Sequence, residues 1–273
     1  DTPGVTISRI EGVKGLPLAP EQNVAGVALM AMLEQVKGAP GIEMEIHKGI
    51  KPGSGIGSSA ASAAGAVFGA NELLGRPFSR KELVRFAMEG EKLVSGNAHA
   101  DNVAPALLGG FVLIRSYAPL DIVEIPAPEE LCCAVIHPQI EVKTADSRAI
   151  LRQEVSLKAA ITQWGNVGGL VAGLLQNDLE LVGRSLEDVV AEPVRSILIP
   201  GYEAVKETAI ASGALGCSIS GSGPSVFALC RGMAVAEKVA AAMGEVYEGL
   251  GVQSAVYASP VNRTGARVMA SNG

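Results

Sequence analysis

The most informative segment of the chain reads Pro52-Gly53-Ser54-Gly55-Ile56-Gly57-Ser58-Ser59. It follows residues 42–47, whose alternation of apolar and polar side chains predicts a half-buried strand. It precedes a run of small residues that predicts a helix to about residue 74. Glycines let a backbone approach a ligand closely, and the first amide groups of a helix point outward unpaired. The segment therefore predicts a strand, a loop suited to a long anion such as a nucleotide triphosphate, and a helix.

Two common phosphate-binding motifs do not fit this segment. A Walker A loop ends in Gly-Lys followed by Ser or Thr, whereas Gly57 is followed by Ser58. The dinucleotide fingerprint requires a third glycine three residues after the second, and Ser58 occupies that place after Gly55. A nicotinamide-binding oxidoreductase therefore fits poorly. A tight turn without any ligand stays open on these residues alone.

The rest of the chain extends this pattern into a mixed fold. Strand-like and helix-like segments follow one another without a steady β-α-β rhythm, which favours an α+β fold over a doubly wound sheet. Ser79 and Glu82 have the spacing of a capping box at the start of a helix. Pro126 and Pro128 mark the domain boundary that we expect, with one domain over residues 1–125 and another over residues 126–273.

The composition is that of an ordinary globular protein and excludes several classes of function. Of the 273 residues, 48% are hydrophobic and 18% are charged. Lys and Arg number 22 and Asp and Glu number 28, so the formal net charge is −6. This charge, without a basic run, argues against a general nucleic-acid binder. No segment approaches the ~20 uninterrupted apolar residues of a membrane span, so we expect no membrane partner.

The cysteines indicate a reducing compartment. Cys132, Cys133, Cys217 and Cys230 include no Cys-x-x-Cys pair, and two adjacent cysteines on a strand point to opposite faces. We therefore expect reduced structural thiols in the cytoplasm, or in an organellar stroma after removal of a transit peptide.

The densest polar cluster of the chain is Ser95-Gly96-Asn97-Ala98-His99-Ala100-Asp101-Asn102-Val103-Ala104-Pro105. On its own, a His-x-Asp sequence is more often a hydrogen-bonded loop pair than a metal site. The chain has three histidines in all and no His-Glu-x-x-His motif. The residues alone therefore indicate a structured polar loop.

Two glycine loops carry a more specific resemblance. Pro52–Ala60 resembles the phosphate loop of the GHMP small-molecule kinases, Pro-x-x-x-Gly-Leu-Gly-Ser-Ser, with Ile56 in place of the usual Leu. A later loop, Ser220–Ser225, resembles the third motif of the same family. The resemblance implies a two-domain α+β fold, with a ribosomal-S5-like N-terminal domain and a ferredoxin-like C-terminal domain. It also implies an ATP site made by Pro52, Gly53, Ser54, Gly55, Ile56, Gly57, Ser58, Ser59, Ser220, Gly221, Ser222 and Gly223.

The polar cluster is similar to that of the family branch that phosphorylates the side-chain hydroxyl of L-homoserine. This resemblance implies that Asp101, Asn102 and His99 form the catalytic group at the hydroxyl end of the substrate. It implies that Arg148 and Arg195 bind the substrate carboxylate, to which planar guanidinium groups are well matched. On the residues alone, both arginines could equally form surface ion pairs.

The same resemblance implies that Glu91 and Ser59 bind Mg²⁺. A magnesium ion bound to phosphate oxygens and water needs few protein ligands, so one carboxylate can suffice. On sequence alone, the preferred reading of Glu91 is a solvated helix residue. Homodimers occur among such kinases, so the resemblance also allows a homodimer.

One part of the family pattern is missing. The first motif of the family, Pro-x-x-x-x-Asn-x-Gly-x-Gly-Phe-Asp, does not occur before Val5. We expect either a longer natural chain, a lost segment or an impaired copy. Two alternatives to a homoserine-phosphorylating enzyme stay open: a GHMP kinase for a different small alcohol, and a non-catalytic relative that binds a ligand.

Overall fold

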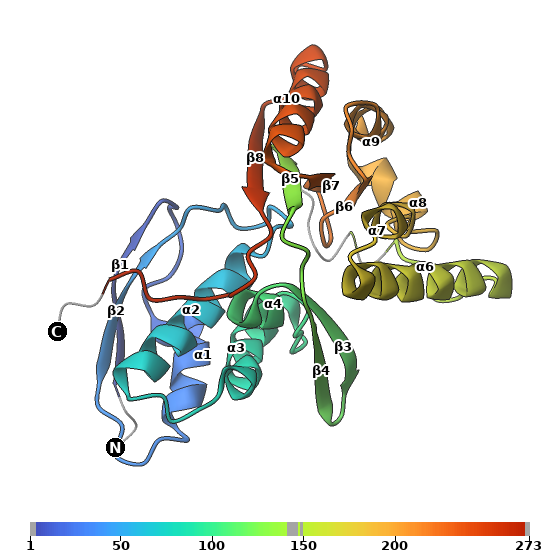
Figure 1. Cartoon of the computed structure of the whole chain (residues 1–273). Helices are drawn as coiled ribbons and strands as arrows, with labels where there is room; N and C mark the ends of the chain where they lie inside the picture. Colours follow the sequence, from blue (N-terminus) through green and yellow to red (C-terminus); the bar gives the residue numbers. More distant parts are fainter. Residues whose placement is uncertain (1–3, 141–146, 148–149, 271–273) are drawn as a thin grey trace. The chain divides into compact units, whose positions relative to one another are not determined.

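The structure, a computed structural model, describes residues 4–140, 147 and 150–270. The chain forms two compact units (Figure 1). Unit 1 comprises Asp1–Pro52, Gly57–Glu124 and Asn262–Gly273, and unit 2 comprises Gly53–Ile56 and Ile125–Val261. The chain thus passes into unit 2 for the tip of the first glycine loop and then returns. The expected domain limits, 1–125 and 126–273, stay a prediction.

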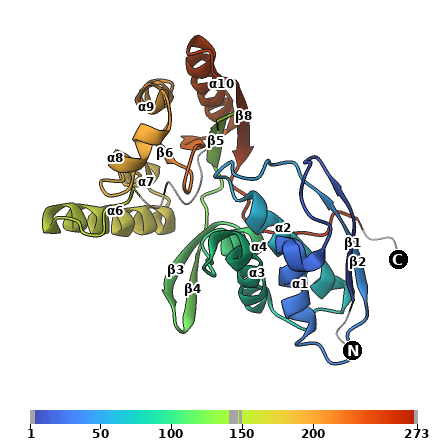
Figure 2. The ribbon, with the colours of Figure 1, turned by 180° about the vertical axis from the view of Figure 1, so that it is seen from behind.

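Unit 1 combines two pairs of strands with a group of helices. Strands β1 (Val5–Glu11) and β2 (Ile42–His47) pair in parallel, and β3 (Phe111–Tyr117) and β4 (Leu120–Ile125) form a second two-stranded sheet. The helices lie on one side of the β1–β2 pair in both views (Figures 1 and 2). They are the short η1 (Pro20–Gln22), α1 (Val24–Leu33), α2 (Ser58–Leu73), α3 (Arg80–Ser95) and α4 (Val103–Leu108).

Local sequence explains how these helices begin. Asn23 caps α1 by accepting a hydrogen bond from the amide of Ala25. Ser79 and Glu82 form the predicted capping box at the start of α3. Alanines and other small residues on α2 let it pack closely against α1 and α3. The core of unit 1 is built from the buried faces of these helices, including Leu29, Met32, Val67, Leu83 and Leu107.

Unit 2 is a four-stranded antiparallel sheet with helices. Strands β5 (Leu131–Pro138), β6 (Gly216–Ile219), β7 (Val226–Arg231) and β8 (Ser254–Pro260) lie in the order β6-β7-β5-β8. If these strands are numbered 1 to 4 along the chain and the sheet is read from the β8 edge, the order is 4-1-3-2. This is the order of a ferredoxin-like sheet. The helices are α6 (Leu157–Gln176), α7 (Leu179–Arg184), α8 (Glu192–Arg195), the short η2 (Ser196–Leu198), α9 (Tyr202–Ala211) and α10 (Met233–Gly249).

The core of unit 2 joins the sheet to α9 and α10. Val239, Met243 and Tyr247 of α10 pack against Ile136 and Val226 of the sheet, and all five are fully buried. Figure 2 shows α10 alongside β8 from behind. The predicted α+β architecture is therefore confirmed. Within the described ranges, no helix combines the length and the apolar character that crossing a membrane requires.

Candidate active site

The two glycine loops, 165 residues apart in sequence, lie against each other inside unit 2. The Ser220 hydroxyl donates a hydrogen bond to the Gly55 carbonyl over 2.8 Å, and the Ser225 hydroxyl donates to the Ser54 carbonyl over 2.5 Å. Ser54 and Ser225 are both buried. The structure thus brings together two groups of residues that the sequence predicts for ATP binding.

Gly55 allows this close approach. Its φ is +79°, which side chains other than glycine rarely adopt, and a Cβ placed there would lie 2.6 Å from the Gly223 carbonyl oxygen and 2.8 Å from that of Ser220. Gly53, Gly57, Gly221 and Gly223 also have positive φ. The loop conformation therefore depends on glycine.

His137 on β5 supports the contact between the loops. Its Nδ1 lies 3.1 Å from the Ser225 hydroxyl oxygen. Because the Ser225 hydroxyl proton points to the Ser54 carbonyl, Ser225 accepts from His137, which assigns the proton to Nδ1. The sequence analysis missed His137. A histidine on an otherwise apolar strand was the available signal.

At the start of α2, the predicted residues Ser58 and Ser59 have different environments. The Ser58 hydroxyl donates to the Ile50 carbonyl over 2.6 Å and is buried, so its side chain serves the turn itself. The half-buried Ser59 hydroxyl instead bonds the carboxylate of Glu91 on α3. Gly57 is the N-cap residue of α2, with φ +75°. The amide groups of this first turn are the ones a helix leaves unpaired.

Glu91 is largely buried in unit 1, with 8% of its surface exposed. Burial raises the pKa of its carboxyl above 4.5, and the nearby charge of Asp101 adds to this rise. The Ser59 hydroxyl, His99 and Lys48 oppose it. Glu91 therefore differs from the solvated helix residue that its sequence context suggests, and it is a carboxylate whose charge a cation would stabilise.

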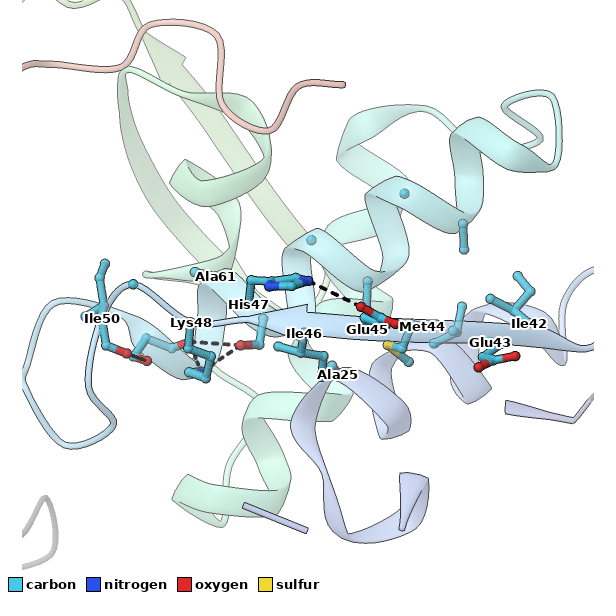
Figure 3. A pocket seen from close by; sticks show the side chains of 18 of the residues that line it. Ala25, Ile42, Glu43, Met44, Glu45, Ile46, His47, Lys48, Ile50 and Ala61 are labelled. Carbon is cyan, nitrogen blue, oxygen red and sulfur yellow. Dashed lines mark hydrogen bonds and ion pairs between the residues drawn. The ribbon is translucent and has the colours of Figure 1, made fainter. Parts of the chain in front are cut away.

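Lys48, at the end of β2, is a second residue that the sequence analysis missed. Its Nζ donates to the Ser58 carbonyl over 2.9 Å and to the Ser62 hydroxyl over 2.7 Å (Figure 3). Burial lowers its pKa, and the charge of Glu91 partly restores it. A lysine four residues before Pro52 was the signal in the sequence. This cation lies at the first turn of α2.

The polar cluster lies next to Gly57. Asp101 and Asn102 are exposed, and Asp101 Oδ1 accepts a hydrogen bond from the Asn102 amide over 3.0 Å. The Asn102 side chain lies 3.6 Å from the position of a Cβ on Gly57. In the part of the chain that the structure describes, the buried Nε2 atom of His99 has no hydrogen-bond partner. The predicted catalytic group therefore lies near the start of α2.

Arg195 contacts the second glycine loop. Its Nη1 donates to the Gly221 carbonyl over 3.0 Å and its Nε to the Ser147 carbonyl over 3.3 Å. The buried Ser147 hydroxyl donates to the Ser222 carbonyl over 2.7 Å. The other predicted substrate arginine, Arg148, lies outside the described residues.

A cavity of about 440 Å³ lies between β2 and α2 in unit 1 (Figure 3). Its walls include Met44, Ile46, Ala61 and Gly65, and Lys48 and Ser58 lie at one end. Its lining also includes Glu43, Glu45 and His47 but none of residues 53–57, so it is a space of mixed polarity beside the loop. Within residues 4–140, 147 and 150–270, no group of three or more His, Cys, Asp or Glu side chains could hold a metal ion.

Comparisons with known proteins agree with this arrangement. The family model for the N-terminal domain of GHMP kinases matches residues 23–110, and that for the C-terminal domain matches residues 170–249. A homoserine kinase of Chlorobium phaeobacteroides is 51% identical over 97% of this chain and 86% of its own length. One from Chlorobaculum tepidum is 47% identical, over 98% of this chain and 85% of its own length.

Solved structures give the same result. The crystal structure of a homoserine kinase from Cytophaga hutchinsonii superposes with a TM-score of 0.92 at 51% identity, covering 97% of this chain and 84% of that one. A mevalonate kinase of L. major has a TM-score of 0.68 at 20% identity, over 95% of this chain and 83% of that one, and shares the fold.

Proposed function

The chain belongs to the homoserine kinase family of GHMP kinases, and we propose that it transfers the γ-phosphoryl group of ATP to the side-chain hydroxyl of L-homoserine. The observation that carries this proposal is the 51% identity to a homoserine kinase over 97% of the chain. The packed glycine loops support it, because a kinase that uses ATP needs backbone amide groups that surround and bind the phosphates.

For ATP, we propose that the triphosphate is held by the backbone of residues 52–59 and 220–223. The first amides of α2 point outward with the positive end of the helix dipole, which favours an anion. Lys48 adds a positive charge at the same turn. The hydrogen bonds of Ser220 and Ser225 would hold the two loops in a fixed position relative to each other.

For Mg²⁺, the donor chemistry of Glu91 and Ser59 fits. Both side chains offer hard oxygen ligands, which Mg²⁺ prefers, and they lie within hydrogen-bond distance of each other. A cation there would offset the cost of an ionised carboxylate at a largely buried position. When bound, the metal would neutralise charge on the phosphate oxygens.

For homoserine, we propose that Arg195 and Arg148 bind the carboxylate, while Asp101, Asn102 and His99 orient the hydroxyl. Two backbone carbonyls hold the Arg195 guanidinium, which reduces the entropy lost on binding a substrate. A loose phosphoryl-transfer transition state requires little early deprotonation of the hydroxyl. Positioning of the substrate hydroxyl and stabilisation of the negative charge of the transition state therefore suffice for the transfer, without a dedicated base.

For its surroundings, we propose that the protein works in the cytoplasm; the family resemblance also allows a homodimer. Cys132, Cys133, Cys217 and Cys230 are all free thiols, as expected in a reducing compartment. Burial raises the pKa of Cys217 to about 12, so this thiol is unreactive.

A coupled assay for ADP release tests the proposed activity. Homoserine, serine and mevalonate are offered in turn with Mg²⁺ and ATP. We expect turnover with homoserine and a kcat/KM at least about 100-fold lower with the other two. Mevalonate lacks the ammonium group and would leave its partners unpaired, and the serine hydroxyl is one methylene too short to be aligned with the phosphate. Turnover of mevalonate instead would favour the second candidate, a GHMP kinase for a different small alcohol. ATP binding without turnover of any of these alcohols would favour a ligand-binding relative.

A further inference from the structure

His137 is a buried polar residue near the end of an otherwise apolar strand. It belongs to β5, an inner strand of the four-stranded sheet, and 7% of its surface is exposed. The pairing of β5 with β7 places Ile136 opposite Val226. The next pair in the same register is His137 and Ser225, and Ser225 is fully buried. The sheet thus holds a histidine and a serine opposite each other.

These two side chains begin a series of hydrogen bonds that ends on the first glycine loop. The Nδ1–H group of His137 donates to the Ser225 hydroxyl oxygen over 3.1 Å, and this hydroxyl donates to the Ser54 carbonyl over 2.5 Å. Because His137 occupies a lone pair of the hydroxyl oxygen, the hydroxyl proton points to the carbonyl. Consecutive hydrogen bonds of this kind strengthen one another, and at a buried position a lost partner is costly.

Ser54 and Gly55 are both held through their carbonyl groups. Ser225 donates to the Ser54 carbonyl, and Ser220 donates to the Gly55 carbonyl over 2.8 Å. In a trans peptide unit, the C=O group and the following N–H group point in opposite directions. The amides of Gly55 and Ile56 are therefore turned away from the two serines. The Ile56 amide lies 3.5 Å from the Ser54 hydroxyl oxygen, too far for a strong hydrogen bond, so it keeps the capacity to bind an anion.

The second glycine loop is closed on itself, so its two serines move together. The Ser220 amide donates to the Ser225 carbonyl over 2.8 Å, and the Gly223 amide donates to the Ser220 carbonyl over 2.9 Å. A displacement of Ser225 would therefore also move the partner of the Gly55 carbonyl. His137, on an inner strand, connects the Ser225 side chain to the most rigid part of the sheet.

We propose that His137 is a positioning residue for phosphoryl transfer. Through Ser225 it sets the orientation of the peptide unit between Ser54 and Gly55, and so of the Gly55 amide that receives a phosphate oxygen of ATP. This inference rests on the proposed function, because it takes ATP as the ligand of the first glycine loop. A histidine that only stabilised the sheet would leave nucleotide binding unchanged.

The experiment measures the binding of ADP with Mg²⁺ by isothermal titration calorimetry. His137→Leu fills a similar space without a donor, and we expect it to raise the ADP dissociation constant about tenfold. His137→Asn places an N–H group near the position of Nδ1, so its dissociation constant should stay within about threefold of the wild type. In steady-state kinetics, His137→Leu should raise the KM for ATP in the same proportion and leave the KM for homoserine within about twofold.

A double-mutant cycle tests the route through Ser225. Ser225→Ala alone should raise the ADP dissociation constant about tenfold, and adding His137→Leu should raise it less than about twofold further, because the connection is already broken. An increase of about 100-fold in the double variant would show that His137 acts independently of Ser225 and would overturn the proposal. His47→Leu is the matched control at a histidine whose side chain is 60% exposed, and it should leave ADP binding unchanged.

The outcomes separate this proposal from the proposed kinase activity. If the wild type phosphorylates homoserine while His137→Leu binds ADP as tightly as the wild type, the proposal is wrong and the activity stands. If His137→Leu weakens ADP binding but the wild type does not phosphorylate homoserine, the activity alone is wrong. A wild type that binds no ADP would overturn both.

Stability measurements exclude a general effect of the substitutions. Urea unfolding establishes that each variant is folded. An equal loss of ADP binding in His137→Asn and His137→Leu would assign the effect to packing and overturn the proposal. If His137→Leu does not fold, Ser225→Ala decides, since unchanged ADP binding in that variant would also overturn it.

Discussion

Gly55 is a residue whose replacement tests the contact between the glycine loops. An alanine Cβ would lie 2.6 Å from the Gly223 carbonyl oxygen, at a φ of +79° that alanine disfavours. We expect Gly55→Ala to raise the KM for ATP at least about tenfold and to lower the unfolding free energy by about 1–3 kcal/mol. Steady-state kinetics and urea unfolding measure both effects.

Gly65 in α2 supplies the matched control for this variant. An added Cβ there meets nothing within 4 Å, and its φ is not positive. Gly65→Ala should stabilise the protein by about 0.5–1 kcal/mol through helix propensity and leave the KM for ATP unchanged. If both variants raised that KM equally, the effect of Gly55→Ala would not come from the loop contact.

Glu91 gives a prediction about pH. Burial raises the pKa of its carboxyl in the folded protein above 4.5, its ordinary value. The folded state therefore binds this proton more tightly than the unfolded state. The contribution of protonated Glu91 to the unfolding free energy is fully present below pH 4.5. It is lost as the pH rises through the raised pKa of the folded protein. The difference in unfolding free energy, wild type minus Glu91→Gln, should decrease over that interval.

Urea unfolding at a series of pH values measures this difference, and activity supplies a second readout. Glu91→Gln should lower kcat/KM about 100-fold if its carboxylate binds Mg²⁺ as we propose, because the metal would stabilise charge in the transition state. A difference in stability that increases with pH would contradict the assignment of Glu91 as a carboxyl disfavoured in its charged form.

At the scale of elements, α8 depends on contacts outside itself. It has four residues and no side-chain cap, so it is too short to be stable alone. Buried Glu192 forms an ion pair with Lys206 of α9, and it accepts a hydrogen bond over 3.0 Å from Ser218 of β6. Arg195 lies three residues further along α8. Glu192 therefore fixes the helix that carries this arginine.

We expect Glu192→Ala to lower the unfolding free energy by about 3 kcal/mol, because Lys206 loses its counter-charge at a largely buried position. It should also raise the KM for homoserine more than the KM for ATP. Glu207→Gln, on the exposed side of α9, is the control and should change stability by less than about 0.5 kcal/mol. Urea unfolding and substrate titrations decide between these outcomes.

Local elements were the part that the sequence could predict. Alternation over residues 42–47 predicted β2, and the spacing of Ser79 and Glu82 predicted the start of α3; the structure confirms both. Helix α6 begins at Leu157, because Ser156 caps it by accepting a hydrogen bond from the Ala159 amide. Helix limits depend on such single hydrogen bonds, which periodicity does not reveal.

At the scale of the whole molecule, long-range contacts were the part that sequence reasoning could not supply. The Ser225–Ser54 hydrogen bond joins residues 171 positions apart, and the sheet order β6-β7-β5-β8 pairs strands that are distant in the chain. His137 gains its role from the first of these contacts, because it bonds Ser225 from a position 88 residues away. The family resemblance gave the candidate site residues, because a family motif reflects spatial contacts shared by related proteins. A single sequence does not reveal those contacts.

Ligand binding should stabilise the whole molecule, and this gives a last prediction. A ligand that binds only the folded state at 100 times its dissociation constant stabilises it by about 2.7 kcal/mol. For a chain of this length, that corresponds to a rise in Tm of roughly 5–10 °C. We expect this rise with ATP and Mg²⁺, and a smaller one when EDTA removes the metal. Differential scanning fluorimetry measures both.

The variants make this measurement specific for the proposed sites. Glu91→Gln should show the same Tm rise with and without EDTA, because its metal site is lost while the phosphate loop remains. Gly55→Ala should show a reduced rise in both conditions, because the loop itself is disturbed. If EDTA lowered the Tm of the nucleotide complex equally in the wild type and in Glu91→Gln, the metal would be held elsewhere, and the assignment of Glu91 as its ligand would be wrong.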